Sequence, residues 1–163
     1  MPSPVFEDLG SAQFSRLVYG AIIGLALTVA LEHEEPDPAV MAGTLVGTGV
    51  AVGLTEFYSE FLGTEIRTRQ RVDRVRFREI EANVVAVIFG ASFPAIFFAL
   101  AAAGAMETET AFDIAKWSGL PLTAFYGFCA ARLRGEGWPA ALFQAAMVAL
   151  IGGFLIGLKA LLH

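Results

Sequence analysis

Cysteine and charged residues are scarce in this chain, and no catalytic motif is present. The single cysteine, Cys129, lies in an apolar segment and excludes both an intrachain disulfide and a metal site built from several thiolates. Charged residues make up 17% of the 163 positions. No nucleophile–base arrangement, phosphate-binding glycine loop, or haem or zinc spacing occurs, so we expect neither an enzyme nor a bound cofactor.

Apolar residues dominate the composition instead. They account for 56% of the chain, whereas soluble domains contain about 45–50%, and the mean hydropathy is +0.63. The composition predicts an integral membrane protein. Glu7 and Asp8 stand where a secretory signal carries its positive charges, and no small-residue cleavage site follows, so we expect the first apolar run to remain as a membrane helix.

Five apolar segments follow a short polar leader at residues 1–13. A spanning helix needs about 17–25 residues. Pro36 and Pro38 cannot continue the first helix, and Pro94 is expected to kink the third. The pattern predicts an all-α polytopic membrane protein with five transmembrane helices in a single domain at residues 14–163, the spans lying at about 14–31, 39–66, 82–106, 111–131 and 138–158.

The second span runs directly into an arginine-rich stretch, RTRQRVDRVRFREIEA, at residues 67–82. This stretch has no proline or glycine to stop a helix. We therefore expect one long helix from Ala39 to Glu81 that leaves the membrane and projects into the cytoplasm. Its six arginines favour anionic lipid headgroups as partners, at about 1 kcal/mol each, and so short a run beside a membrane argues against nucleic acid.

The basic residues are distributed unequally between the loops. With the N-terminus in the cytoplasm, nine arginines fall on the cytoplasmic side, and only Lys116 and Lys159 fall on the other side. This asymmetry predicts an inner-membrane protein with its N-terminus in and its C-terminus out, which requires an odd number of spans. The outer loops are acidic instead, with Glu32, Glu34, Glu35 and Asp37 in one and Glu107, Glu109 and Asp113 in the other.

Glu56 and Glu60 interrupt the second apolar segment one helical turn apart. Positions i and i+4 share a helix face, and Glu56 falls roughly 26 Å from the outer end of the helix, inside a core of about 30 Å. A carboxylate there costs about 2.5–3.5 kcal/mol, so it should face a cavity, a partner helix or a cation. Glu56 and Glu60 are therefore candidate metal ligands or proton carriers. The alternative is a solvated helix end at which both acids pair with arginines such as Arg67.

Four glycine pairs have the GxxxG spacing that lets helix backbones approach closely in a membrane. The spacing favours packing inside one five-helix bundle. A homodimer joined through the glycine-rich faces, or contact with other membrane subunits, is the alternative. The pairs are Gly20/Gly24, Gly43/Gly47, Gly49/Gly53 and Gly153/Gly157.

Short motifs along most of the chain resemble those of a known protein family. RLVYGAIIGLALT, residues 16–28, and GLTEFYSE, residues 53–60, are similar to the first- and second-helix motifs of the vacuolar iron transporter family. These family motifs are a glycine followed by an Asn-Asp-Gly triplet and an Ala-Gly-Glu-Tyr-Val-Ser core, which aligns Glu56 with the family's conserved glutamate. FYGFCAARLRG and GGFLIGLKALL resemble the fourth and fifth helices.

The resemblance implies a homodimer that exchanges Fe²⁺ or Mn²⁺ for protons, in which Glu56 and Glu60 of two subunits supply oxygen ligands suited to hard divalent metals. Two departures stand against this function. Ile23 replaces the family's membrane-embedded aspartate, and the glutamate-rich cytoplasmic insert gives way to basic residues 66–81 that repel Fe²⁺. A non-transporting membrane scaffold or an accessory subunit of a membrane complex is therefore the alternative function.

Overall fold

The computed structural model describes residues 4–34 and 36–162, and within these ranges the chain forms helices and no strand. The all-α prediction is confirmed. The first helix extends back through most of the leader, because it begins at Pro4 rather than near Phe14. The elements are α1 (Pro4–Leu31), the 3₁₀ turn η1 (Glu32–Glu34), α2 (Pro38–Thr68), α3 (Arg74–Ser92), α4 (Ala95–Ala102), α5 (Thr108–Leu133) and α6 (Trp138–Leu162).

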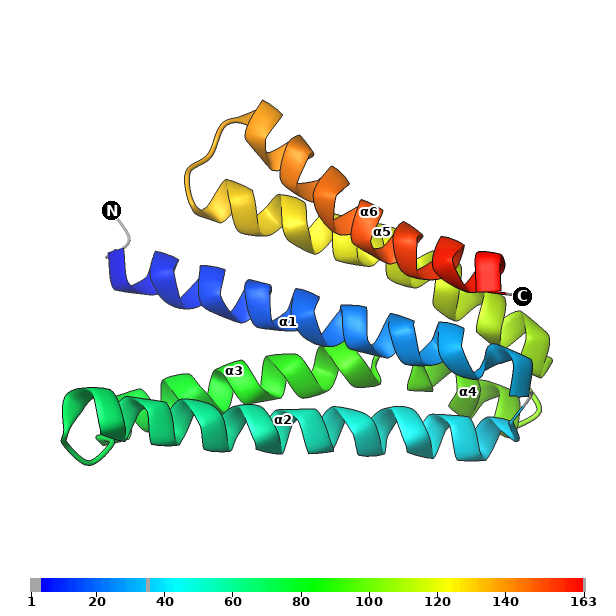
Figure 1. The fold of residues 1–163 in the computed structure, drawn as a ribbon, viewed down its shortest axis with the longest axis horizontal. Coiled ribbons are helices and arrows are strands. Elements are labelled where there is room, and N and C mark those ends of the chain that lie inside the picture. Colours follow the sequence, from blue (N-terminus) through cyan, green and yellow to red (C-terminus); the bar gives the residue numbers. More distant parts are fainter. Residues whose placement is uncertain (1–3, 35, 163) are drawn as a thin grey trace.

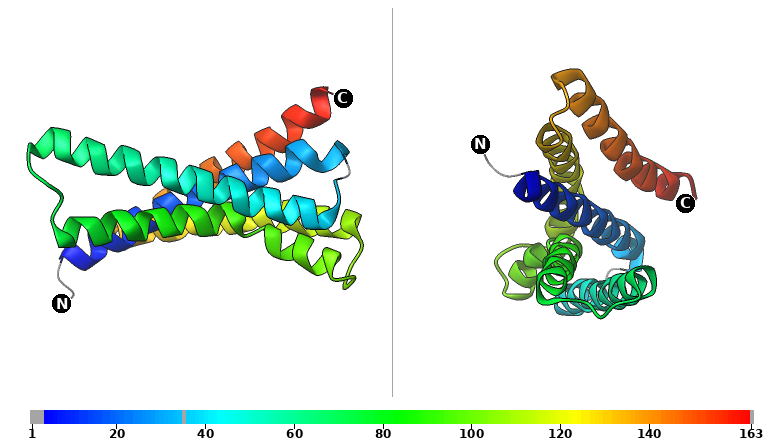
Figure 2. Two further views of the ribbon diagram at one scale, coloured as in Figure 1. Left: turned by 90° about the horizontal axis from the view of Figure 1, so that it is seen from below. Right: turned by 90° about the vertical axis from the view of Figure 1, so that its left-hand side faces the viewer.

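Helix α1 lies in the middle of the molecule (Figures 1 and 2). It packs on α3 on one side and on α5 on the other, while α2 covers α3 and α4, and α6 covers α5. The α2–α3 and α5–α6 turns lie at the same end of the bundle, on opposite sides of α1. We call this end the basic end because it carries Arg67–Arg78, Arg132 and Arg134. The opposite end, with residues 32–34, 36–37 and 103–107, is called the acidic end.

Within the described residues, two helical segments are long and apolar enough to cross a membrane, Gln13–Leu31 and Pro38–Thr68. The bent pair of α3 and α4 makes a third if the two helices form one span. Helix α6 adds a shorter apolar segment, Trp138–Ile151. Large apolar side chains remain exposed along these helices, including Leu54 at 62% and Phe89 at 54%. Contiguous exposed apolar surface of this kind is unusual on a soluble monomer and indicates contact with lipid. The fold is therefore that of a membrane protein with transmembrane helices.

The prediction of one helix from Ala39 to Glu81 is wrong. Helix α2 ends at Thr68, where Arg69 adopts the left-handed conformation at φ 53°. Asp73 then starts α3, because its carboxylate accepts a hydrogen bond from the Arg76 backbone N–H at 2.8 Å. This N-cap satisfies a donor that has no partner within the helix. The turn lets α3 run back along α2, so that the apolar residues after Ala82 pack against the apolar face of α2.

The predicted kink at Pro94 is confirmed. Helices α3 and α4 meet at an angle of 48° on either side of Phe93 and Pro94. Proline has no backbone N–H and cannot continue the regular helical hydrogen-bond ladder. The chain uses shorter i to i−3 bonds instead, from the Ile96 N–H to the Phe93 carbonyl at 3.3 Å and from the Phe97 N–H to the Pro94 carbonyl at 3.1 Å.

Glycines bring α1 into direct backbone contact with α3. A Cβ atom on Gly20 would lie 2.2 Å from the Val87 carbonyl oxygen, and one on Gly24 would lie 2.6 Å from the Ala91 carbonyl oxygen. On α3, a Cβ on Gly90 would lie 2.4 Å from the Leu17 oxygen. Any side chain at these positions would push the two helices apart, which explains why the sequence has glycine here.

The four glycine pairs divide into two groups. Gly20/Gly24 pack on α3, as do Gly49/Gly53, whose added Cβ atoms would lie 2.5 Å from Ser92 Oγ and 2.4 Å from Ile88 Cγ1. Packing inside the bundle is therefore confirmed for these two pairs. The other two pairs, Gly43/Gly47 and Gly153/Gly157, have space in front of them, with no atom within 4 Å of an added Cβ.

A cluster of buried apolar side chains holds the acidic end together. It joins α2, α4 and α5 through Met41, Leu45, Phe98 and Phe112, each at most 4% exposed. The Phe98 and Phe112 rings meet edge to face, with their centroids 4.7 Å apart. At the basic end, the contact between α1 and α2 is made by charged side chains.

Candidate functional site

The two predicted site residues lie on the same face of α2, directed toward α1 and α3. Arg16 on α1 contacts both of them: its Nη1 atom forms an ion pair with Glu56, and its Nη2 atom lies 3.6 Å from Glu60 Oε2. The side chains of Glu56 and Glu60 are 19% and 28% exposed. The sharing of one face is therefore confirmed. The alternative, that both acids pair with an arginine, is also confirmed, but the arginine is Arg16 on α1 and not Arg67.

Asn83 on α3 completes the cluster. Its Nδ2 atom donates a hydrogen bond of 3.4 Å to Glu60 Oε1. The other oxygen, Glu60 Oε2, is buried and accepts no hydrogen bond from any described residue. Arg16, Glu56, Glu60 and Asn83 thus form what we call the inner cluster, in which α1, α2 and α3 each contribute at least one polar side chain.

The inner cluster has more negative than positive charge. Two carboxylates face one guanidinium, so the cluster carries a net charge of −1 when both acids are ionised. Removing a carboxylate from water is costly unless partner charges and hydrogen bonds replace the lost solvent. Glu56 has such a replacement in its ion pair with Arg16, whereas Glu60 Oε2 has only a guanidinium nitrogen at 3.6 Å. A proton or a cation at Glu60 would neutralise the excess charge.

The inner cluster is less suited to a divalent metal ion than to a proton. Within the described parts of the chain, no three or more His, Cys, Asp or Glu side chains gather in a way that would hold a metal ion. The positive charge of Arg16 beside Glu56 also repels a second cation. Glu56 and Glu60 are brought together as predicted, but one chain supplies only these two acidic ligands.

Sequence reasoning missed Arg16 and Asn83 as members of the site. Arg16 is one of the nine arginines that predict the orientation of the chain, and it also stands at the start of an apolar segment. Asn83 is an isolated polar residue between Ala82 and Val84 in the third apolar segment. A polar side chain in such a segment needs a partner on another helix, and this signal was available in the sequence.

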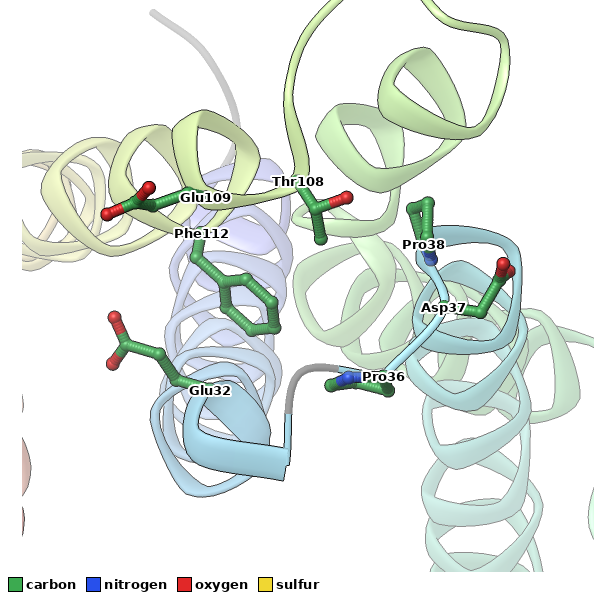
Figure 3. A pocket seen from close by; sticks show the side chains of 7 residues that line it. All are labelled: Glu32, Pro36, Asp37, Pro38, Thr108, Glu109 and Phe112. Atoms are coloured by element: carbon green, nitrogen blue, oxygen red, sulfur yellow. The ribbon is translucent and has the colours of Figure 1, made fainter.

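A pocket of about 600 Å³ opens at the acidic end (Figure 3). Glu32 and Glu109 lie on one side of the pocket, with Phe112 between these two glutamates, and Asp37 lies on the opposite side. Asp37 is also the N-cap of α2, because its Oδ1 atom accepts a hydrogen bond of 2.9 Å from the Ala39 N–H. Glu35, which was predicted to add to this acidic surface, lies outside the described residues.

Lys116 balances the acids beside this pocket. Its Nζ atom contacts Glu32 and lies 3.1 Å from Asp113 Oδ1. The Lys116 side chain is 17% exposed, whereas that of Asp113 is 59% exposed. We call Lys116, Glu32 and Asp113 the outer cluster. Along α2, the acidic end at Asp37 and the carboxylate of Glu60 are about 35 Å apart, roughly the thickness of a membrane core.

Comparisons of the chain with protein-family models, with curated proteins and with solved structures found no match. The resemblance to the vacuolar iron transporters therefore stays a prediction. Ile23, which stands where that family has its aspartate, is half-buried in α1 about two turns beyond Arg16. Its apolar side chain adds no ligand or proton acceptor to the inner cluster.

Proposed function

We propose that this protein is a transporter of the inner membrane that exchanges divalent cations, Fe²⁺ or Mn²⁺, for protons. It crosses the membrane five times, with its N-terminus in the cytoplasm and its C-terminus outside. In this proposal Glu60 is the carboxylate that takes up and releases the proton, and Arg16 holds Glu56 in place. The proposal agrees with the resemblance to vacuolar iron transporters.

One observation carries the proposal: the buried Glu60 Oε2 atom in a cluster of two carboxylates and one guanidinium. Along α2, Glu56 lies within a core of about 30 Å and Glu60 lies at the inner edge of that core. Ionisable residues within membrane segments are costly and commonly belong to ion or proton pathways, so Glu60 stands at the mouth of such a pathway in this proposal. A structural ion pair between Arg16 and Glu56 alone would need no second carboxylate. Glu60 adds a negative charge that no described basic residue fully balances, which supports a site for an exchangeable positive charge.

The distribution of charge supports the proposed topology. The arginines of the α2–α3 and α5–α6 turns lie at the basic end, and Arg16 lies near the same end of α1. Cytoplasmic loops carry an excess of basic residues, which supports a cytoplasmic location for this end. Helix α2, with 31 residues, has a length of about 46 Å and exceeds the membrane core by roughly 16 Å, so its last turns project into the cytoplasm.

The carboxylates of the inner cluster are unfavourably placed for a metal site shared by two chains through the open face of α2. Gly43 and Gly47 lie on the side of α2 opposite to Glu56 and Glu60, at about 100° of rotation per residue. A dimer joined at those glycines would keep the two inner clusters apart. We therefore propose that Glu60 carries protons as its main role. Binding of the metal by Glu56 and Glu60 is the less favoured role of these two residues.

Transport in proteoliposomes tests the proposed function. Uptake of Fe²⁺ or Mn²⁺ would be measured under an imposed pH gradient for the natural protein, for Glu60→Gln and for Asp113→Asn. Asp113 is the matched control because it is the second acid of a lysine-centred cluster but is exposed to water. We expect uptake by the natural protein and by Asp113→Asn, and at least a tenfold loss in Glu60→Gln. Folded natural protein without metal-dependent uptake would contradict the proposal.

A non-transporting membrane scaffold is the second candidate function. It is favoured by the open glycines Gly43 and Gly47, which leave a smooth strip on the exposed side of α2 where another helix could approach closely. This function predicts that Glu60→Gln is silent and that Gly47→Leu abolishes association with another chain. Crosslinking in native membranes, followed by size analysis, would detect that association.

A further inference from the structure

A groove of about 520 Å³ runs along the outside of the contact between α1 and α3. Two of the residues that line the groove belong to α1, and six belong to α3. None of them belongs to the inner cluster. The lining residues are Gln13, Leu17, Arg78, Glu81, Ala82, Val85, Ala86 and Phe89.

The polarity of this groove changes along its length. Arg78, Glu81 and Gln13 are at the basic end, while Val85 and Phe89 continue the groove toward the middle of the molecule. Val85 is 58% exposed and Phe89 is 54% exposed, so their apolar surfaces are not covered by the rest of the chain. The groove therefore has a cationic end and an apolar floor, like the two parts of an amphiphilic molecule.

Arg78 is available to bind an anion. It is exposed, and it forms no ion pair with any acidic residue whose side chain the structure describes, a set that begins at Glu32. Arg76, in contrast, is paired with Glu79 at 2.8 Å. Arg74 stands one turn earlier on the same side of α3 and adds positive charge at this end. Glu81 is the opposing charge in the groove, so the net charge of Arg74, Arg78 and Glu81 is +1.

Arg78 and Phe89 lie at the membrane depths of a lipid's phosphate group and its acyl chains. The hydrogen bond between Asn83 and Glu60 aligns α3 with α2, which places Phe89 within the hydrocarbon core of about 30 Å. Arg78 lies about 16 Å further along α3 than Phe89, beyond the inner edge of that core. A lipid of the leaflet on the side of the basic end has its phosphate and its acyl chains at these two levels.

We propose that this groove is a binding site for an anionic phospholipid, with the phosphate at Arg78 and an acyl chain along Val85 and Phe89. Arg78 can donate two parallel hydrogen bonds to a phosphate group. An apolar helix from another chain fits less well, because it would remove the Arg78 charge from water without replacing its partner. This inference is independent of the transport function, since it requires only that α1 and α3 lie in a membrane.

Native mass spectrometry of the detergent-released protein tests the site. The protein would be loaded with phosphatidylglycerol or with phosphatidylcholine of the same acyl chains. We expect the natural protein to retain phosphatidylglycerol preferentially. In Arg78→Gln the occupancy should fall roughly fivefold, the effect of one arginine at a lipid surface. The matched control is Arg67→Gln, which removes an exposed arginine of the same basic segment but outside the groove, and it should retain the lipid.

Further variants exclude the other occupants. Ala86→Trp fills the apolar floor and should reduce binding of both lipids, while the helical circular dichroism signal stays unchanged. Excess inorganic phosphate should not displace the lipid if the acyl chain contributes. The proposal is overturned if the natural protein binds both lipids equally, if Arg67→Gln loses as much lipid as Arg78→Gln, or if phosphate alone displaces the lipid. A change of oligomeric state in Ala86→Trp, with lipid retained, would identify the occupant as protein.

Discussion

The inner and outer clusters contain the same charges in different surroundings. Arg16 faces Glu56 and Glu60 at the basic end, and Lys116 faces Glu32 and Asp113 at the acidic end. In both, one basic side chain stands between two carboxylates, so each carries one negative charge in excess. A count of charges does not distinguish them.

Exposure to water does distinguish the two clusters. The second acid of the outer cluster, Asp113, has a side chain that is 59% exposed, so water can solvate its charge. The second acid of the inner cluster, Glu60, is 28% exposed, and its Oε2 atom is buried without a hydrogen bond. The second acid is therefore well solvated at the acidic end, whereas at the basic end it is partly buried and depends more on neighbouring side chains for its stabilisation.

The largest predicted effect concerns the glycines that place Arg16 beside the two glutamates. Gly20→Leu would collide with the α3 backbone, whose nearest oxygen lies 2.2 Å from an added Cβ. We expect a loss of about 3 kcal/mol or more in the free energy of unfolding, measured by denaturation in detergent. Gly43→Leu is the control, because nothing lies within 4 Å of an added Cβ there. Equal destabilisation by both changes would contradict the close α1–α3 contact.

Removing the basic residue should destabilise the inner cluster more than the outer cluster. Arg16→Gln leaves two partly buried acids without their cation, and we expect a loss of about 1–3 kcal/mol, since the 35% exposure of Arg16 screens part of the effect. Lys116→Gln should cost about 1 kcal/mol, because Asp113 stays solvated. Denaturation in detergent measures both. Stability should return in part when Glu56→Gln is combined with Arg16→Gln, and failure of this rescue would contradict the ion pair.

The smallest effects concern the two aspartates that begin helices at opposite ends. Asp73→Ala removes the N-cap of α3, and Asp37→Ala removes the N-cap of α2, so each should cost about 1 kcal/mol. Asn at either position keeps a side-chain hydrogen-bond acceptor and should preserve stability. Asp37→Asn also removes a negative charge from the pocket at the acidic end. Thermal unfolding of the four variants separates capping from charge. A loss in Asp73→Asn as large as in Asp73→Ala would exclude capping.

Much of the fold follows from local sequence patterns. Proline has no backbone N–H to donate, so its effect on a helix can be read locally: helix boundaries near Pro36 and Pro38, and a kink at Pro94. The common face of Glu56 and Glu60 follows from helical periodicity. The turn at Arg69–Asp73 was missed because arginines are good helix formers, and the left-handed Arg69 is stable only when α3 packs back on α2. An N-cap aspartate such as Asp73 was a visible signal of the new helix.

The pairing of Arg16 with the glutamates could not be predicted from spacing along the chain. It depends on how closely α1 approaches α2 and α3, which Gly20, Gly24 and Gly90 determine through contacts between distant segments. The burial of Glu60 Oε2 depends on the same packing. For this reason the sequence located the two candidate acids, whereas their partners became apparent only in three dimensions.

Infrared difference spectroscopy tests the central claim about Glu60 most directly, because a protonated carboxyl group and a carboxylate absorb at different frequencies. The reconstituted protein would be compared before and after a change of pH and after addition of Mn²⁺. We predict a carboxyl signal that appears and disappears with these changes, that is absent in Glu60→Gln and that is retained in Asp113→Asn. The same signal in Glu60→Gln and in the natural protein would show that Glu60 exchanges no positive charge and would contradict the account.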